Sequence, residues 1–426
     1  MTGNIYDELK ARGFIAQVSD EAAVRKMFAE KSVTYYIGYD CTAPSLHAGS
    51  LVPIMAMVHL RRSGHRTIAV IGRGTTMVGD PSGKTEMRQL LEEESIRSFA
   101  GTIRAQLDRY LGFDGTHALA VDNADWLLPL NYVEFLRDIG RHFSVNRMLA
   151  AEAYKLRLEK GLSFIEFNYQ LLQAYDYLTL FRTHGCTLQM GGDDQWGNIL
   201  AGVDLIRRVE GAQVEAVTFP LLETASRAKM GKTAKGAVWL DGKLFSPFDY
   251  FQYWVNTDDR DVGRFLKLFT LLPLDEIANL AALKGAEINY AKRVLAFEAT
   301  KLTHGEGPAQ EARAASAAVF ISDTVIENLH LTDHVTDNVT VNIKSLPTTI
   351  INRARLEVGI SPAELFTEVG LTPSRGEAKR IIKQGGLYVN DERIESLERL
   401  LTIKDVGPGG MLLKAGKKKI HRVVAD

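Results

Sequence analysis

The sequence predicts an α/β fold, in which helices cover a parallel sheet, followed by a helical region and a small basic C-terminal domain. Two observations predict the sheet. Short apolar, β-branched runs alternate with helical patterns as far as Asp249, and this alternation is typical of a parallel sheet with covering helices. Beyond Asp249 the strand signal fades and aromatic and leucine residues recur at helical spacing, which predicts a helical region.

Five runs have the composition of buried strands. They are VTYYIGY (33–39), TIAVIG (67–72), HALAVD (117–122), CTLQMG (186–191) and AVTFPLL (216–222). Helices are expected between them at 50–63, 86–112, 146–160, 163–184 and 194–208. Runs that are apolar at nearly every position fit strands buried on both faces. Because ligands bind at the carboxyl ends of the strands in such sheets, the residues after each strand are the first candidates for a site.

The size and composition fit a soluble globular protein of two or three domains. The chain has 426 residues, of which 46% are hydrophobic and 24% charged. Cys41 and Cys186 are too few for a disulfide framework or a four-cysteine zinc site, which favours a reducing compartment. No apolar run reaches the roughly 18 residues of a membrane span, and the N-terminus has no signal or transit pattern. We therefore expect a cytoplasmic protein without a membrane partner.

The charge is distributed unevenly along the chain. The net charge is −1, but residues 351–426 carry 14 Lys and Arg against 10 Asp and Glu. The run KAGKKKIHR (414–422) lies in this basic end. A basic domain on an acidic body indicates an anionic polymer as partner, and a solvated charged tail is the alternative.

The first motif, YDCTAPSLHAGS, follows the first predicted strand and leads into an amphipathic helix. A helix N-terminus offers unpaired N–H groups and a positive dipole end to an anion. Thr42 and His47 can add donors, and Gly49 lets a ligand approach the backbone. The alternative is an ordinary turn in which Ser50 caps the helix.

The second motif, GRGTTMVGDPSGKTE, follows the second strand. Three residues separate Gly79 from Gly83, whereas a phosphate-binding P-loop needs four, so the P-loop interpretation fails. Asp80 in this loop can hold a substrate ammonium group, and a plain turn is the alternative.

The third motif, SFIEFNYQLLQAYDYLTLF, is helical. Tyr169, Gln173 and Asp176 fall at i, i+4 and i+7 and therefore share one face. A phenol, an amide and a carboxylate in line suit a small zwitterionic ligand, and a solvated polar face is the alternative.

The fourth and fifth motifs contain glycine beside charged residues. The motif LQMGGDDQWGN follows the fourth strand. Gly192 leaves space for a ligand to approach the backbone, and Asp194 and Gln195 can accept hydrogen bonds from ribose hydroxyls. Helix capping by the aspartates is the alternative. In AKMGKT (228–233), Lys229 and Lys232 can close over phosphates, and a solvated loop is the alternative.

The last motif, SRGEAKRIIKQGGLYVNDERI (374–394), reads as a capped helix followed by a strand. Lys379, Arg380 and Lys383 lie near one helix face, where cations fit a phosphate backbone. Helix solubility is the alternative, and the basic balance of the domain favours nucleic acid.

Taken in order, the segments SLHAGS, GDPSGK, YQLLQAYD, GGDDQWGN and KMGKT resemble class I aminoacyl-tRNA synthetases, most closely the bacterial tyrosine-specific branch. The stretch 374–394 resembles the S4-type RNA-binding domain of that branch. The resemblance covers about residues 33–420. YQLLQAYD and GGDDQWGN are specific to the tyrosine branch, whereas the histidine and lysine signatures are shared by the whole class.

The resemblance implies an architecture. It predicts a Rossmann-like catalytic domain with a dimer-forming helical insertion (1–248), a helical anticodon-arm-binding domain (249–320), a linker (321–350) and an S4-like RNA-binding domain (351–426). It also implies a homodimer formed through helices near residues 130–160. The implied reaction joins L-tyrosine to tRNA(Tyr) with ATP as a substrate that acts together with Mg²⁺, without a tightly bound cofactor or a resident metal.

The resemblance also implies residue roles. Tyr36 and Asp176 would hold the tyrosine phenol, and Asp80, Tyr169 and Gln173 the ammonium group. The expected catalytic residues are His47, Thr42, Lys229, Lys232 and Thr233. The expected ATP contacts are Gly38, Asp40, His47, Gly49, Ser50, Gly192, Asp194, Gln195 and Lys232. The expected RNA contacts are Lys379, Arg380 and Lys383.

The chain departs from the family pattern at two positions. Ser50 stands where a second histidine is usual, and Ile37 where some relatives have a polar side chain facing ribose. Gly231 stands where many class members have serine, a variant that is common in the tyrosine branch. Three alternatives remain open: a tryptophan-specific synthetase, a nucleotidyltransferase that uses no RNA, and a non-catalytic RNA-binding relative. The pair Tyr36 and Asp176 argues against the tryptophan-specific synthetase, and the basic C-terminal end argues against the nucleotidyltransferase. The intact His47 argues against the non-catalytic relative.

Overall fold

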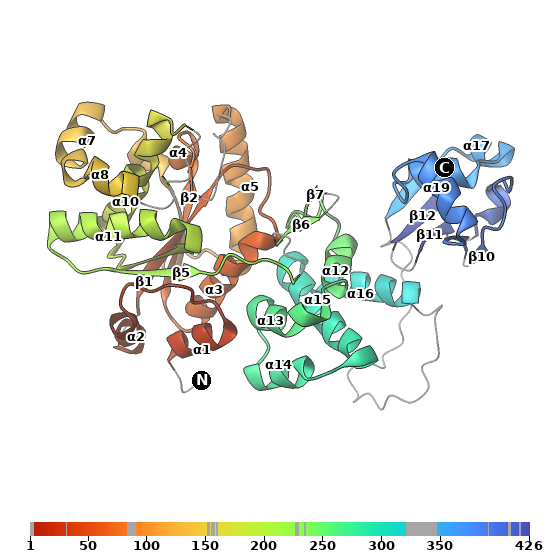
Figure 1. Cartoon of the computed structure of the whole chain (residues 1–426), viewed down its shortest axis with the longest axis horizontal. Coiled ribbons are helices and arrows are strands. Elements are labelled where there is room, and N and C mark those ends of the chain that lie inside the picture. The colour runs from red at the N-terminus through yellow and green to blue at the C-terminus, as the bar shows by residue number, and fades with distance from the viewer. Residues whose placement is uncertain are drawn as a thin grey trace. The chain divides into compact units, whose positions relative to one another are not determined.

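The computed structural model describes residues 4–426 except 31, 83–90, 151–153, 155–157, 159–160, 226–229, 234–235, 321–346, 391, 408–409 and 417–418. The chain divides into two compact units (Figure 1). The first contains residues 1–245 and 256–299, and the second contains residues 246–255 and 300–426.

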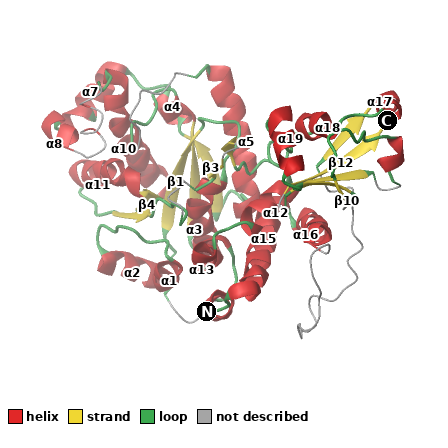
Figure 2. Cartoon of the chain, turned by 45° about the vertical axis from the view of Figure 1, so that its right-hand side comes forward, coloured by secondary structure: helices red, strands yellow, loops and turns green. Residues whose placement is uncertain are grey.

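A five-stranded parallel sheet forms the centre of the first unit (Figure 2). Its strands are β1 (Thr34–Asp40), β2 (Arg66–Gly72), β3 (Ala118–Asp122), β4 (Leu188–Gly192) and β5 (Glu215–Phe219). Every pairing between these strands is parallel, so the predicted fold class is confirmed. The fifth predicted run, 216–222, was placed too far along the chain, because pairing with β4 ends at Phe219.

The strand order, β3-β2-β1-β4-β5, creates the place for a ligand. The chain builds outward from β1 to β2 and β3, and then crosses back to add β4 and β5 on the other side of β1. Tyr36 of β1 therefore lies between Ile68 of β2 and Gln189 of β4. A crevice opens at the carboxyl ends of strands where the order reverses in this way.

Helices surround the sheet. They are α1 (Ile5–Arg12), α2 (Glu21–Glu30), α3 (Leu51–Arg62), α4 (Arg73–Thr76), α5 (Glu93–Leu111), α6 (Ala124–Leu127), α7 (Tyr132–Asp138), α8 (Val145–Ala150), α10 (Phe164–His184) and α11 (Trp196–Glu210). Short 3₁₀ turns are η1 (Ala48–Ser50), η2 (Gly140–His142) and η3 (Asp193–Gln195). The predicted helix 86–112 begins only at Glu93 within the described residues, and most of the predicted helix 146–160 lies outside them.

The long helix α10 has strong end signals. Ser163 caps its N-terminus in a capping box with Glu166, and Gly185 ends it with φ +62°. These signals fix where the helix begins and ends. Tyr169, Gln173 and Asp176 of this helix line the crevice at the sheet.

A helical region follows the sheet. Its helices are α12 (Pro247–Val255), α13 (Asp259–Phe269), α14 (Leu274–Ala281), α15 (Ile288–His304) and α16 (Glu306–Phe320), with the 3₁₀ turn η4 (Gly285–Glu287). The buried guanidinium of Arg12 in α1 donates to the carbonyls of Lys267, Thr270 and Leu272. The start of the chain is thereby joined to the end of α13 and the residues after it.

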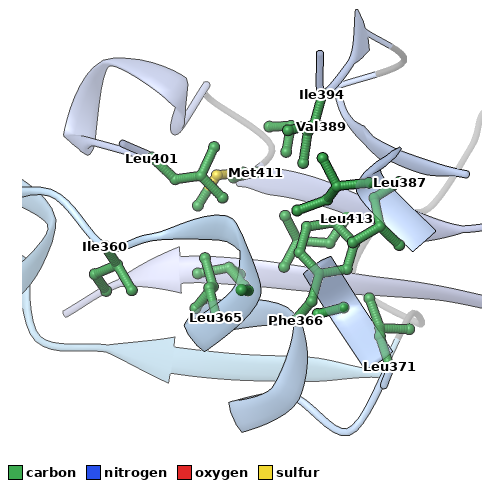
Figure 3. Packing of buried hydrophobic residues seen from close by; sticks show 14 of the residues in the cluster. Ile360, Leu365, Phe366, Leu371, Leu387, Val389, Ile394, Leu401, Met411 and Leu413 are labelled. Atoms are coloured by element: carbon green, nitrogen blue, oxygen red, sulfur yellow. The ribbon is translucent and has the colours of Figure 1, made fainter. Parts of the chain in front are cut away.

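The C-terminal domain has a sheet of its own, in the order β10-β9-β11-β12-β8. Its elements are β8 (Thr348–Ile351), α17 (Arg353–Val358), α18 (Pro362–Glu368), α19 (Arg375–Lys383), β9 (Leu387–Val389), β10 (Glu392–Arg393), η6 (Ile403–Asp405), β11 (Met411–Ala415) and β12 (Lys419–Ala425). Phe366 of α18 and Leu387, Met411 and Leu413 of the sheet share one buried core (Figure 3). Because β8 pairs with β12, the sheet already begins inside the segment predicted as a linker.

None of the helices in the described part of the chain combines the length and hydropathy of a membrane span.

Candidate active site

A cavity of about 550 Å³ lies at the carboxyl ends of the strands of the first unit. Many residues predicted from separate motifs line it together. They are Tyr36, Gly38, Asp40, His47, Gly49, Ser50, Asp80, Tyr169, Gln173, Asp176, Gly192, Asp194 and Gln195. Strand order and helix rotation therefore gather the strand-end motifs around one space.

The Tyr36 hydroxyl is one buried polar group of this cavity. The side chain is 1% exposed, and its Oη has no hydrogen-bond partner among the described residues. The ring packs edge-on against Tyr177, with 5.4 Å between centroids. Burial, and then the charge of Asp176, raise the pKa of Tyr36 well above its usual value. A buried hydroxyl without a partner is a rare feature that a ligand with a polar end would complete.

Asp176 is the buried carboxylate of the same cavity. Its Oδ2 accepts from Asn123 Nδ2 at 3.0 Å, and its Oδ1 accepts from Trp126 Nε1 at 2.7 Å. Burial raises the pKa of Asp176 to about 7, although both hydrogen bonds act in the opposite direction. Sequence reasoning missed Asn123 and Trp126. Asn123 directly follows β3, so the rule of searching strand ends could have found it, but nothing in the sequence singles out Trp126.

Asp80 and Gln195 were predicted to bind different parts of the ligands, and they contact each other. Gln195 Nε2 donates to Asp80 Oδ2 at 2.7 Å. The other oxygen accepts from the backbone of Ser82 at 2.9 Å and from Asn198 Nδ2 at 3.5 Å. Asp194 lies nearby, and burial together with the charge of Asp80 raises its pKa. A concentration of carboxylates in a partly buried site favours a cation such as an ammonium group.

Asp40 and Tyr169 form a second polar pair. Tyr169 Oη donates to Asp40 Oδ2 at 3.1 Å, while Thr75 Oγ1 donates to Asp40 Oδ1 at 2.9 Å. Burial raises the pKa of Tyr169 well above its usual value, so its hydroxyl remains a donor at neutral pH. The pair joins the end of β1 to α10 across the crevice.

Two amide oxygens in the cavity wall have no hydrogen-bond partner among the described residues. They belong to Gln173 of α10 and Gln189 of β4. Gln189 was not predicted, because a residue inside a buried strand resembles any other core position in a single sequence. Both oxygens can accept from a ligand that carries N–H or O–H groups.

His47 stands at the start of η1, which leads directly into α3. The backbone N–H of Gly49 donates to His47 Nδ1 at 3.0 Å. When Nδ1 accepts, the neutral ring carries its proton on Nε2, which is then a donor. This donor and the positive end of α3 favour an anionic ligand. Ser50 makes no capping bond with its side chain, and it lines the cavity.

The lysine motif lies against the histidine motif. Gly231 has φ +77°, and a Cβ at this position would lie 2.7 Å from the Gly49 nitrogen and 3.0 Å from His47 Nδ1. Only glycine fits such a contact, which explains why this position does not carry serine. The hairpin β6 (Lys232–Thr233) and β7 (Gly236–Ala237) follows. Lys229 and the side chains of Lys232 and Thr233 lie outside the described part of the structure.

Two further predicted groups lie outside the cavity. Thr42 is exposed and does not line it. Lys379, Arg380 and Lys383 are exposed on α19, whose opposite face buries Ala378 and Ile382 in the core of the C-terminal domain. Arg380 also pairs with Glu377 at 2.6 Å.

Comparison with known proteins decides the family. The family described as tRNA synthetases class I (W and Y) matches residues 29–321. The chain belongs to the class I tRNA synthetases of this W and Y family. A second family, described as the tyrosine–tRNA ligase SYY-like C-terminal domain, matches residues 339–423.

Individual synthetases resemble the chain over most of its length. A tyrosine–tRNA ligase of Syntrophus aciditrophicus is 54% identical, covering 98% of this chain and 97% of the relative. One of Desulfosudis oleivorans is 52% identical and covers 99% of both. Among solved structures, a C-terminally truncated mitochondrial tyrosyl-tRNA synthetase of Aspergillus nidulans is 30% identical with a TM-score of 0.68. It covers 74% of this chain and 94% of the solved chain.

Proposed function

We propose that this synthetase is a tyrosine–tRNA ligase. It activates L-tyrosine with ATP to tyrosyl-adenylate and pyrophosphate, and then transfers the tyrosyl group to the 3′ end of tRNA(Tyr). The near full-length identity of 54% and 52% to tyrosine–tRNA ligases supports the reaction. The geometry of the cavity supports the choice of amino acid.

One observation carries the amino-acid specificity. The Tyr36 hydroxyl lacks a partner among the described residues, and it lines the same cavity as the buried Asp176 carboxylate. A tyrosine phenol satisfies both groups, because its O–H donates to the carboxylate and its oxygen accepts from Tyr36. Phenylalanine would leave the buried Tyr36 hydroxyl without a partner and would donate no hydrogen bond to Asp176, so the cavity rejects it by the cost of that unpaired polar group and the lost bond.

The other end of the amino acid meets the acidic side of the cavity. We assign the α-ammonium group to Asp80, Tyr169 and Gln173, which supply a carboxylate and two neutral oxygens. The hydrogen bond from Gln195 to Asp80 links this group to the turn that we assign to ribose, Asp194 and Gln195. Gly38 and Gly192 leave room for the nucleotide beside the backbone of β1 and β4.

In the first reaction, a carboxylate oxygen of tyrosine attacks the α-phosphorus of ATP. The bond from this phosphorus to the bridging oxygen of pyrophosphate breaks, and pyrophosphate leaves with the electron pair. No covalent bond to the protein forms, so the protein contributes position and charge stabilisation. We assign His47 Nε2–H, the N-terminus of α3 and the lysines of the 228–233 motif to the phosphates, with contacts that strengthen in the transition state.

ATP enters as its magnesium complex in this proposal. Among the described residues, no group of three or more His, Cys, Asp or Glu side chains is arranged to hold a metal ion. We assign Mg²⁺ to the phosphates of ATP, because this hard cation prefers oxygen ligands and is commonly bound through substrate phosphates.

The remaining assignments concern partners. We assign tRNA binding to the exposed Lys379, Arg380 and Lys383 of the S4-like domain, because cations on one helix face attract a phosphate backbone. We also propose a cytoplasmic homodimer. Tyr132 and Val133 of α7, Val145 of α8 and Phe164 of α10 are apolar and exposed on helices of the same flank of the sheet. A second copy would cover them.

Pyrophosphate–ATP exchange with each amino acid in turn tests the proposal. Exchange that depends on tyrosine, with much weaker exchange for phenylalanine, is expected. Exchange that depends on tryptophan instead would contradict the assignment of Tyr36 and Asp176. Charging of tRNA(Tyr) with labelled tyrosine then tests the second step.

A further inference from the structure

The side chain of Gln106 is buried beneath the histidine motif. Helix α5, which the structure describes throughout, buries Ile96, Ala100, Ile103, Gln106, Leu107 and Leu111, and Gln106 is the polar member of this set. It is 4% exposed. Burying an amide costs free energy unless its donors and acceptors are paired. The hydrogen-bond partners of Gln106 therefore indicate its structural role.

Both ends of the Gln106 amide bind the segment that precedes His47. Its Oε1 accepts from the backbone N–H of Leu46 at 2.9 Å, and its Nε2 donates to Ser45 Oγ at 2.9 Å. Ser45 Oγ in turn donates to the Leu46 carbonyl at 2.7 Å. Leu46 is adjacent to His47, so the amide holds the backbone that positions the imidazole.

The opposite edge of the same segment holds the continuation of the lysine hairpin. Leu240 N–H donates to the Leu46 carbonyl at 2.8 Å, and Ala48 N–H donates to the Val238 carbonyl at 2.8 Å. Asp241 N–H donates to Ser45 Oγ at 3.2 Å. Ser45 Oγ therefore receives hydrogen bonds from both sides, from Gln106 and from the backbone after the hairpin.

Residues 238–241 are continuous with the lysine motif. Val238 N–H donates to the Gly231 carbonyl at 2.8 Å, and Ala237 of β7 pairs with Lys232 of β6. One ladder of hydrogen bonds thus runs from Gln106 through Ser45 and Leu46 to the backbone that carries the lysine motif. The two motifs, which are far apart in the sequence, are joined through this ladder.

We propose that Gln106 is a positioning residue for adenylate formation, which holds the His47 segment in register with the lysine hairpin. This inference rests on the proposed function. Gln106 is not among the residues that line the cavity, so its loss should leave tyrosine binding intact and impair the step in which pyrophosphate leaves.

The first test is Gln106→Met, which keeps the side-chain length and removes both hydrogen bonds. Because a small misplacement of catalytic groups is costly, kcat for pyrophosphate exchange should fall roughly ten-fold or more, with the KM for tyrosine within about two-fold. The control is Gln252→Met in α12. In the wild type, Gln252 Nε2 donates to Ser316 Oγ at 2.9 Å, so this substitution also removes a hydrogen bond from an amide to a serine hydroxyl. The kcat of the control should not change.

A conservative variant separates positioning from packing. In Gln106→Glu, burial should keep the carboxyl group neutral at low pH, and a neutral carboxyl accepts from Leu46 and donates to Ser45 as the amide does. Its kcat relative to wild type should therefore be near one at about pH 6 and should fall as the pH rises and the carboxyl group ionises. A loss of packing alone would give no such pH dependence.

Ser45→Ala decides the matter if Gln106→Met does not fold, since it removes only one hydroxyl. Its kcat should fall with the KM for tyrosine unchanged. In the double variant Ser45→Ala/Gln106→Met, the fold-decrease in kcat should be smaller than the product of the two single fold-decreases, because both substitutions break the same hydrogen-bond network. The proposal would be overturned if kcat were unchanged in the folded variants, or if it fell no further than in Gln252→Met. It would also be overturned if the loss of kcat in the double variant Ser45→Ala/Gln106→Met equalled the product of the two single losses. A wild-type protein without tyrosine-dependent exchange would instead overturn the proposed function, and this inference with it.

Discussion

Trp126 donates a hydrogen bond from Nε1 to Asp176 Oδ1 at 2.7 Å, beside the bond from Asn123 to the other oxygen. The carboxylate is thus held in one orientation by two neutral donors. This arrangement keeps the charge of Asp176 directed at the Tyr36 end of the cavity, where burial would otherwise make an unpaired carboxylate unstable.

Trp126→Phe should therefore weaken the recognition of tyrosine. The variant keeps an aromatic side chain, although a smaller one, and removes one hydrogen bond to a buried carboxyl group, so the KM for tyrosine should rise roughly ten-fold, with a smaller change in kcat. Steady-state pyrophosphate exchange measures both. Trp254→Phe in α12 is the control and should bind tyrosine as the wild type does. An unchanged KM in Trp126→Phe would show that Asp176 needs no support from the indole.

The stability of the protein should depend on pH through Asp176. Burial raises the pKa of its carboxyl group from 3.8 to about 7. Between these pH values the folded protein binds more protons than the unfolded chain, so the free energy of unfolding falls as the pH rises. Asp176→Asn removes this contribution. The Tm of the variant minus that of wild type should therefore increase from about pH 4 to about pH 7 and then level off. A constant difference would contradict a carboxyl group that titrates near neutrality.

Gly231→Ala should impair catalysis more than Gly236→Ala. Both glycines have positive φ, +77° and +112°, so an alanine strains the backbone at either position. At Gly231 the added methyl group meets the Gly49 nitrogen and the His47 ring, whereas no atom of the described residues beyond its chain neighbours lies within 4 Å of a methyl group at Gly236. We expect kcat for exchange to fall roughly a hundred-fold in Gly231→Ala and only a few-fold in Gly236→Ala. Equal losses would show that backbone strain alone matters.

The proposed dimer makes a prediction about mass. Val133 of α7 is 71% exposed and Phe164 of α10 is 69% exposed. Replacing either with Asp should lower the mass in light scattering from that of two chains to that of one at micromolar concentration, because the charge would be buried at the interface. Val358 of α17 is 80% exposed, and Val358→Asp is the control that should leave the mass unchanged. A monomeric wild type would refute the homodimer.

Much of this protein is predictable from local pattern. Alternation of apolar runs with helical periodicity predicts the five strands and the parallel sheet, since both faces of such strands must be buried. Tyr169, Gln173 and Asp176 are predictable as a set, because helical spacing alone puts them on one face. His47, Asp80 and Asp194 are found by examining the residues after each strand.

Other features depend on which elements become neighbours in space. The order β3-β2-β1-β4-β5 puts Gln189 beside Tyr36, and the hydrogen bonds of Asn123 and Trp126 to Asp176 depend on the same packing. The ladder from Gln106 to the lysine hairpin joins three segments that are distant in sequence. Thr42, although close to His47 in the chain, is exposed and does not line the cavity. The physical reason is that periodicity determines which face of an element is buried, whereas the partner of a buried polar group depends on how the elements pack together.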